Sequence, residues 1–375
     1  MATLLKLVAG GNHNCALWNN STVTCCGHNL HAQLGQGDTV NRNVHTLVPL
    51  IGAIDDIWTG GSHTCVTTAG QLKCWGENYL GRLGYADQNV RGDQPGEISS
   101  LAAVPLPSDF SDLAGSGEHA CAIVTGDVYC WGNGVQGQLG IGSTHTVVGV
   151  AAATAVDLGG RKAVQVSVGA GQSCVVLDTA DTRCWGDGVG DAPGEMGDNL
   201  VSPSAHLGPV KQIACGGGMF CVVLEDGRVA CAGSNSWGQL GLGDTTARST
   251  LEVIGGGLRA EYISLMDKTT CALNNGNVFC WGVGHNGQLG QGNAEHSSVP
   301  VQVPWLRPGV QQLSVGHQHV CALDQERWVC WGGNGYGTLG LGHNEWVGTT
   351  SANTGLEQAT VYTNPTTTTT TTTTT

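Results

Sequence analysis

The chain has 375 residues, a net charge of −14 at pH 7 and only 15 lysine and arginine residues. Because nucleic-acid affinity comes largely from lysines and arginines that displace counterions, this balance excludes an extended nucleic-acid surface. No run of 18 apolar residues is present, so we expect no membrane insertion. Sixty glycines and few charged residues indicate short strands joined by tight turns, without long amphipathic helices.

The two ends of the chain differ from its middle. Residues 1–8 are too short for a cleavable signal and run straight into the first repeat, so we expect either no export signal or a partial chain. After Pro365 the sequence is unbroken threonine, a composition typical of a disordered stalk or O-glycosylated linker. We predict a repeat domain over 1–363 and a threonine-rich tail over 364–375.

A pair of cysteines recurs seven times along the chain. The second cysteine follows the first after nine or ten residues and usually opens the tripeptide CWG, with a G-Q-L-G-like tetrapeptide soon after. The first cysteines of successive pairs are 47 to 56 residues apart. A period near fifty indicates one supersecondary unit repeated in a ring or a stack.

The sixth repeat gives the clearest prediction of strands, over 262–265, 271–274, 277–280 and 299–303. The pair Asn275-Gly276 favours a type I′ hairpin turn between the second and third strands. Four sequential strands with short turns form a β-meander, which is the blade of a propeller. The predicted fold is therefore all-β, a seven-bladed β-propeller of four-stranded antiparallel blades.

The hairpin register predicts disulfide bonds. With Asn274 opposite Asn277, Cys271 faces Cys280 in a non-hydrogen-bonded pair, whose Cα atoms lie about 4.5 Å apart and within disulfide range. Where the spacing grows by one residue, the loop also gains one, and Gly227 takes its left-handed position. The predicted bridges are Cys15–Cys25, Cys65–Cys74, Cys121–Cys130, Cys174–Cys184, Cys221–Cys231, Cys271–Cys280 and Cys321–Cys330.

Two alternatives to these bridges need weighing. One alternative that stays open is a cytosolic protein in which the seven cysteine pairs are buried but reduced, because disulfide formation depends on the compartment. Zinc sites are disfavoured, since the spacing is not that of metal ligands and no second pair completes each site. Cys26, which replaces the tryptophan of CWG, and Cys215 are left over. Each of these two cysteines is either a buried thiol or forms a disulfide, with the other one or with another chain.

The recurring string GGxHxCAL…CWG.N..GQLG resembles the repeat of the regulator of chromosome condensation family. Instances are GGSHTCVTTAGQLKCWGENYLGRLG over 60–84 and VGHQHVCALDQERWVCWGGNGYGTLGLG over 315–342. The resemblance covers residues 4 to about 363 and implies a seven-bladed β-propeller. The paired cysteines resemble the secreted or cell-surface versions of this repeat rather than the nuclear exchange factor.

Two loops depart most from the repeat. Over 187–199 the sequence DGVGDAPGEMGDN carries Gly-Glu-Met-Gly where G-Q-L-G is expected, and RGDQPGE over 91–97 lies in the longest stretch between repeats. Loops on a rigid scaffold often carry function. The candidate rim-loop binding residues are Arg91, Asp93, Glu97, Asp187, Asp191 and Glu195.

These loops also have bland interpretations. Asp187, Asp191, Glu195 and Asp198 could bind calcium through their carboxylates, but their spacing is not that of an EF-hand and acidic turns are commonly only solvated. The tripeptide Arg91-Gly92-Asp93 matches an integrin ligand, yet we interpret it as a turn. We predict no metal and no cofactor.

Histidines and tryptophans recur at fixed places in the repeat. Four histidines precede the first cysteine by two residues: His13, His63, His119 and His319. Their dispersal over separate blades disfavours a shared metal, and we predict turn histidines that bond the backbone within their own blade. The tryptophans after the second cysteine are Trp75, Trp131, Trp185, Trp281 and Trp331, and we predict packing between blades for them.

The sequence lacks the motifs of two functional classes, ultraviolet photoreceptors and enzymes. The family resemblance includes ultraviolet-sensing members with a GWRHT-like motif, but the matching positions here, such as GGNHNC, lack tryptophan. No Ser-His-Asp set with motif context, phosphate-binding loop or H-E-x-x-H pair is present, so we predict no enzyme.

Residues 19–22 contain two overlapping N-glycosylation sequons at the predicted tip of the first hairpin, which adds a little to the secreted interpretation.

The leading hypothesis is a non-catalytic scaffold, monomeric and extracellular or in a secretory lumen, whose rim loops bind a protein or glycan. The resemblance implies an alternative, guanine-nucleotide exchange on a small Ran-like GTPase, with 86–108 as the only stretch long enough for a wedge. A third possibility is a purely structural repeat or an inhibitor of a secreted enzyme, similar to β-lactamase inhibitory propellers. We expect ring closure by pairing of residues 2–8 with strands of the last blade, whose outer part would be 357–362.

Overall fold

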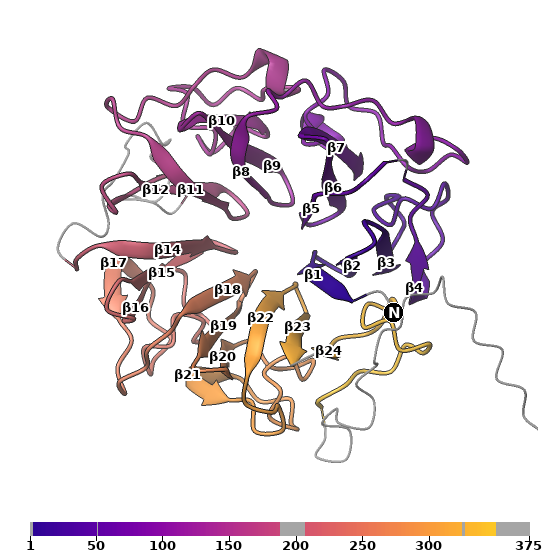
Figure 1. The fold of residues 1–375 in the computed structure, drawn as a ribbon. Helices are drawn as coiled ribbons and strands as arrows, with labels where there is room; N and C mark the ends of the chain where they lie inside the picture. Colours follow the sequence, from indigo (N-terminus) through magenta and orange to yellow (C-terminus); the bar gives the residue numbers. More distant parts are fainter. Residues whose placement is uncertain (1–2, 51, 188–206, 325–326, 350–375) are drawn as a thin grey trace, which may run out of the picture.

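The computed structural model describes residues 3–50, 52–187, 207–324 and 327–349. Seven antiparallel sheets stand around a central axis, with the first strand of each sheet nearest to that axis (Figure 1). Strand order within each sheet follows the sequence, so the chain runs outward through one blade and then returns to the centre for the next. This confirms the predicted seven-bladed β-propeller.

Three blades have the predicted four strands. Blade 1 consists of β1 (Leu4–Ala9), β2 (His13–Trp18), β3 (Val23–Gly27) and β4 (Arg42–Leu47). Blade 5 consists of β14 (Val210–Cys215), β15 (Met219–Leu224), β16 (Val229–Gly233) and β17 (Arg248–Val253). Blade 6 consists of β18 (Tyr262–Met266), β19 (Thr269–Asn274), β20 (Asn277–Gly282) and β21 (Ser297–Gln302).

The other four blades have three strands among the described residues. Blade 2 consists of β5 (Asp56–Thr59), β6 (His63–Thr68) and β7 (Gln71–Gly76), and blade 3 of β8 (Phe110–Gly115), β9 (His119–Val124) and β10 (Asp127–Gly132). Blade 4 consists of β11 (Ala163–Val168), β12 (Gln172–Leu177) and β13 (Thr182–Gly186), and blade 7 of β22 (Val310–Val315), β23 (His319–Asp324) and β24 (Arg327–Gly332).

In blades 2, 3 and 7 the fourth strand is reduced to isolated bridges. These bridges join Gly76 to Arg91, Gly132 to Val147, Tyr129 to Ala155, and Gly332 to Val347. Glycines with positive φ lie just after the bridge residues, namely Gly92, Gly149 and Gly348. A left-handed residue cannot continue an extended strand, so the ladder stops there. In blade 4 the matching segment falls largely outside the described residues.

The sixth repeat folds as its sequence predicts. Asn274 faces Asn277 and Cys271 faces Cys280 in the antiparallel ladder between β19 and β20. Asn275 has φ 47° and Gly276 has φ 73°, as a type I′ turn requires. In the hairpin of blade 5, Gly227 has φ 83°, which confirms its predicted left-handed position.

The hydrophobic core lies between neighbouring blades. The second strands are buried along their full length in blades 1, 3, 4 and 5, because a sheet covers each of their faces. One apolar cluster joins Leu17 of blade 1, Trp75 of blade 2 and Leu113 of blade 3. Burial on both faces explains why these strands show apolar runs rather than alternation.

The expected closure of the ring through residues 2–8 is wrong for the described part of that segment, residues 3–8. β1 pairs with β2 of its own blade across a three-residue turn, and so its partner is already fixed. Strand β1 contacts blade 7 through hydrogen bonds between side chains and backbone instead. Gln312 Nε2 donates to the Leu5 carbonyl at 2.9 Å, and the Ala9 N–H donates to Ser314 Oγ at 2.9 Å. Residues 357–362 and the predicted tail lie outside the described residues.

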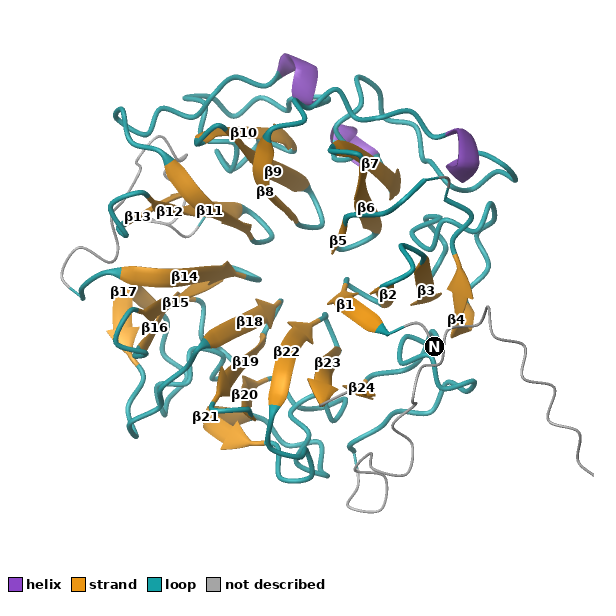
Figure 2. Ribbon diagram, in the orientation of Figure 1, coloured by secondary structure: helices purple, strands orange, loops and turns teal. Residues whose placement is uncertain are grey.

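Within the described ranges, helices are confined to three short 3-10 turns in the connections between blades (Figure 2). They are η1 (Tyr79–Gly81), η2 (Ile98–Ser100) and η3 (Val150–Ala152). In the described part of the chain, no helix has the length and apolar character needed to cross a bilayer.

Candidate functional site

The paired cysteines lie on the second and third strands of every blade. In all seven pairs the Cα atoms are 4.1 Å apart, and each pair is disulfide bonded. The bonded pairs are those that the hairpin register predicts. Each bridge sits in the buried centre of its blade, so the rigid part of the scaffold is the same in every repeat.

A first layer of contacts between blades comes from the inner strands. β1, β8, β11, β14 and β22 each have a register shift next to their first residue. A bulge redirects the side chain that follows it. After each shift, a side chain bonds the next blade at 2.7–2.9 Å: Lys6 to Asp56, Asp112 to Val166, Gln165 to Ile213, Gln212 to Ile263, and Gln312 to Leu5.

The repeated histidines form a second layer, and the prediction that they bond their own blade is wrong. Their Nε2 atoms reach the next blade, from His13 to Thr64 Oγ1 (3.0 Å), from His119 to Ser173 Oγ (2.7 Å) and from His319 to Asn14 Oδ1 (2.8 Å). Successive strand residues point to opposite faces, so His13 reaches blade 2 while Asn14 reaches blade 7. Burial lowers the pKa of each of these histidines to about 3, which keeps them neutral.

The tryptophans form a third layer, which confirms the predicted packing between blades. Trp75 Nε1 donates to the Gln33 carbonyl at 3.0 Å, and Thr64 Oγ1 donates to the same carbonyl at 2.8 Å. The other tryptophan bonds, at 2.9–3.0 Å, are Trp131 to Arg82, Trp185 to Gln138, Trp281 to Gln239 and Trp331 to Gln288. In these five cases the second residue of the G-Q-L-G-like motif thus offers its carbonyl to the following blade.

The two leftover cysteines are both free and buried. Cys26 Sγ donates to the Thr338 carbonyl at 3.3 Å, so it takes the place of the tryptophan bond in blade 1. Burial raises the pKa of the Cys26 thiol above its ordinary value, and it raises that of Cys215 to about 12. A thiol that stays protonated is a poor nucleophile, so neither cysteine is a reactive centre in the folded chain.

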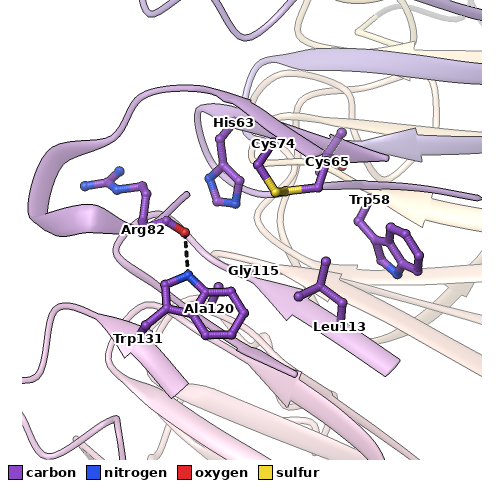
Figure 3. Close-up of a pocket in the computed structure, with 10 residues that line it drawn as sticks. Trp58, His63, Cys65, Cys74, Arg82, Leu113, Gly115, Ala120 and Trp131 are labelled. Carbon is purple, nitrogen blue, oxygen red and sulfur yellow. Dashed lines mark hydrogen bonds between the residues drawn. A yellow bond between two sulfur atoms is a disulfide. The ribbon is translucent and has the colours of Figure 1, made fainter. Parts of the chain in front are cut away.

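The histidine layer is interrupted between blades 2 and 3. Ala120 stands where the junctions on either side carry Thr64 and Ser173, so His63 lacks the corresponding hydroxyl partner. A cavity of about 10 Å³ remains there, lined by His63, Ala120 and Arg82 together with the Cys65–Cys74 bridge (Figure 3). This volume is about the minimum that one water molecule needs. The site is therefore a packing defect and is too small for a substrate.

A larger opening lies on the axis of the ring. It has a volume of about 220 Å³ and is lined mainly by the loops between first and second strands, including Gly61, Gly117 and Gly216, with Glu118, Asp267 and His317. Backbone hydrogen bonds link these loops from blade to blade, for example from Gly61 N to the Ser116 carbonyl and from His317 N to the Gly11 carbonyl. The opening is therefore bounded by backbone with a few acidic side chains.

The loops after the third strands place apolar side chains in water. Five residues after the second cysteine stand Leu30 (63% exposed), Tyr79 (62%) and Val135 (56%), and six residues after it stand Trp237 (42%) and Tyr336 (43%). We call these five residues the loop-face set. Antiparallel order puts these loops on the same face of the ring as the axial opening. This set was not predicted from the sequence, although its distance of five or six residues from the second cysteine was a usable signal.

Two members of the loop-face set contact histidines of the following blade. The rings of Tyr336 and His28 lie 4.5 Å apart edge to face, and those of Trp237 and His296 lie 4.8 Å apart. Burial and the nearby His31 charge lower the pKa of His28. These aromatic contacts hold the exposed rings in place at the junctions of blades 7 and 1 and of blades 5 and 6.

The predicted rim residues of blade 2 are mostly held within the protein. Arg91 pairs with Asp87 at 2.8 Å and lies 3.8 Å from the centre of the Tyr85 ring. Glu97 accepts the Gly92 N–H at 2.7 Å, so it closes its own turn. Asp93 is only partly exposed and accepts from the Gln94 side chain at 3.2 Å. The turn interpretation of the RGD tripeptide fits these contacts.

The predicted rim loop of blade 4 is described only at its start. Asp187 is exposed and accepts from Gln136 Nε2 at 3.1 Å. Asp191, Glu195 and Asp198 lie outside the described residues. Among the residues that the structure describes, no three histidine, cysteine or acidic side chains gather closely enough to hold a metal ion.

Comparison with known proteins gives consistent results. Models of the regulator of chromosome condensation (RCC1) repeat match residues 125–176, 275–323 and 210–239. The human E3 ubiquitin-protein ligase HERC2 is 27% identical over 342 residues, which cover 85% of this chain but 7% of HERC2. The ultraviolet-B receptor UVR8 of Arabidopsis thaliana is 26% identical over 84% of this chain and 73% of its own length.

The fold also matches a solved structure of yeast RCC1 (Prp20) bound to Kap60. The TM-score is 0.75 at 18% identity, covering 98% of this chain and 85% of that one, so the likeness is one of fold. The same architecture follows from the repeat matches, from the fifty-residue period and from the seven radial sheets. The chain contains repeats that match the regulator of chromosome condensation (RCC1) repeat models, and it has a seven-bladed β-propeller fold.

Proposed function

We propose that this chain is a non-catalytic scaffold of an extracellular or secretory-lumen compartment, and that its loop-face set binds a protein partner. The observation that carries the proposal is the set itself. Large apolar side chains stand exposed at one of two adjacent loop positions in five blades, all on the same face of the ring. Aromatic anchors such as Trp237 and Tyr336 are the side chains that dominate protein interfaces.

A protein fits this surface better than a glycan does. The loop-face set spreads over separate blades around the ring, whereas a bound sugar needs its aromatic and polar contacts in one concave pocket. The relatives support the choice, because the yeast RCC1 of the matching structure is bound to the protein Kap60. We keep Asp93 and Asp187 as polar residues beside the surface, and we assign Arg91 and Glu97 to the internal structure.

The compartment is argued from the cysteines. Seven bridges within one chain are typical of proteins that fold in an oxidising environment. Mass spectrometry after alkylation in denaturant without reductant should find two alkylated cysteines, Cys26 and Cys215, and fourteen bonded cysteines in the natively expressed chain. Sixteen alkylated cysteines would contradict the compartment.

Partner capture from the secreted fraction tests the binding face. The test variant carries Leu30→Ser, Tyr79→Ser and Val135→Ser. The control variant changes residues on the outer strands, Val44→Ser and Val299→Ser, which are 49% and 48% exposed. We expect a partner retained by the wild-type chain and by the control, and reduced at least tenfold by the test variant. Equal retention by all three chains would refute the proposed face.

Guanine-nucleotide exchange is the second candidate, favoured by the fold match to yeast RCC1 over almost the whole chain. The packing of residues 86–108, the candidate wedge, is evidence against nucleotide exchange. Ile98, Leu101 and Val104 are buried, and Gly92 accepts the Gly37 N–H from blade 1, so this segment packs onto the ring. A nucleotide-release assay with a Ran-like GTPase should show no acceleration, and a clear acceleration would favour exchange instead.

A further inference from the structure

The tip of the hairpin between β2 and β3 contains two overlapping N-glycosylation sequons, Asn19-Asn20-Ser21 and Asn20-Ser21-Thr22. We propose that Asn20 is the acceptor of an N-linked oligosaccharide, and that Asn19 is not. The proposal rests on the proposed passage through a secretory lumen, where the transferring enzyme works. It adds a modification site whose position bears on the binding face.

Asn20 has the geometry that a sequon needs. Its side chain is exposed at the end of the hairpin. Thr22 donates to Asn20 Oδ1 through both its hydroxyl, at 2.7 Å, and its backbone N–H, at 3.4 Å. The hydroxyl two residues on is therefore already joined to the amide, in an Asx-type turn. Ser21 has φ 59°, a left-handed conformation that turns the chain back and brings Thr22 under Asn20.

Asn19 is committed to a structural contact. Its Oδ1 accepts the backbone N–H of Thr3 at 3.0 Å, and its own N–H donates to the Thr3 carbonyl at 2.9 Å. No bond from Ser21 to the Asn19 amide matches the one from Thr22 to Asn20. The two sequons look equivalent in sequence, but the fold gives only the second one its hydroxyl contact.

The reaction is a group transfer without redox change. Asn20 Nδ2 forms a bond to the anomeric carbon of a polyprenyl-diphosphate-linked oligosaccharide. The bond from that carbon to the diphosphate oxygen breaks, and its electron pair leaves with the diphosphate. The amide nitrogen gives up one proton to a base of the transferase. The products are a glycosylated asparagine and a free polyprenyl diphosphate.

The position of the glycan agrees with the proposed binding surface. In an antiparallel blade the hairpin between the second and third strands lies at the opposite end from the loops that follow the third strand. An oligosaccharide on Asn20 therefore projects from the face opposite to Leu30 of the same blade. It would add solubility and bulk there while it leaves the loop-face set uncovered.

The experiment uses the full chain, secreted from animal cells behind a supplied signal sequence. Thr22→Val removes the second sequon and keeps the branched shape, whereas Ser21→Gly removes the first and suits the left-handed backbone. After treatment with peptide N-glycosidase, peptide mass spectrometry locates the converted asparagine. We expect a glycan on Asn20 in the wild-type chain and in Ser21→Gly, and none in Thr22→Val.

Two results would overturn the proposal: an unmodified wild-type chain, or a glycan on Asn19. Free-thiol counts on the same samples separate this outcome from a failure of the proposed function. An unmodified chain with seven disulfides contradicts the glycan alone. An unmodified chain whose paired cysteines are all reduced contradicts the proposed compartment as well.

Discussion

The junction between blades 7 and 1 and the junction between blades 2 and 3 use the same repeat differently. At the first, Asn14 bonds both His319 and the Thr338 carbonyl at 2.8 Å, and Cys26 bonds that carbonyl too. At the second, Ala120 occupies the position that matches Asn14, and a small cavity lies beside His63. Strand β5 also lacks the register shift that directs a side chain to the next blade.

Chain connectivity explains the difference. Blades 2 and 3 are joined by residues 77–109, so they stay close even with few polar contacts between them. Blades 7 and 1 are about 300 residues apart in sequence, and in the described residues only their mutual contacts hold them together. Polar side chains therefore concentrate at the closing junction, where opening the ring would otherwise cost least.

Acid should weaken both junctions, and it should lower the free energy of unfolding more than any of the substitutions below. The folded histidines His13, His63, His119 and His319 have pKa values of about 3, against 6.5 in the unfolded chain. Between these values the unfolded chain binds more protons, so stability is full above pH 6.5 and falls as the pH drops toward 3. Each histidine contributes on the order of 1 kcal/mol per pH unit.

Urea unfolding at pH 7 and pH 5 measures this effect. The control changes all four histidines to glutamine, the residue that blade 4 carries at the same position as Gln172. We expect the wild-type chain to lose several kcal/mol over two pH units, and the control to lose much less. A control with the same pH dependence as the wild-type chain would contradict the assignment to these histidines.

Replacing Asn14 with alanine should make the closing junction resemble the junction of blades 2 and 3. Asn14→Ala leaves the buried His319 and the Thr338 carbonyl without their amide partner, which costs about 3 kcal/mol. Asn14→Thr is the matched rescue, because Thr64 fills that position in blade 2. Urea midpoints should rank wild type above threonine and threonine well above alanine; equal threonine and alanine values would contradict the role of the hydrogen bonds.

Adding a hydroxyl at the weaker junction should have the smallest effect, in the opposite direction. Ala120→Ser places Oγ in the cavity beside His63 and should stabilise the fold by about 1 kcal/mol. Ser173→Ala, the reverse change at the next junction, should destabilise it by about the same amount. Differential calorimetry of both variants checks the pair, and a destabilised Ala120→Ser chain would show that the cavity does not accept the group.

Parts of the molecule set by neighbours in sequence were predictable. Asn275-Gly276 sets its turn, the turn sets the register, and the register brings Cys271 opposite Cys280. The tryptophan packing followed from the same repeat. The partners of the histidines were not predictable, because His13 and Thr64 are 51 residues apart and His319 and Asn14 are 305 apart. The residues next to a histidine in the sequence do not indicate which residue of the neighbouring blade it contacts.

The sequence alone determined the blade, its hairpin and its disulfide, because period-two alternation and turn chemistry act over a few residues. The tertiary structure alone decided how blade meets blade. It placed Ala9 against Ser314, joined His13 to Thr64 and joined His319 to Asn14. Such contacts join segments whose distance in space depends on the whole ring, and so no local pattern encodes them.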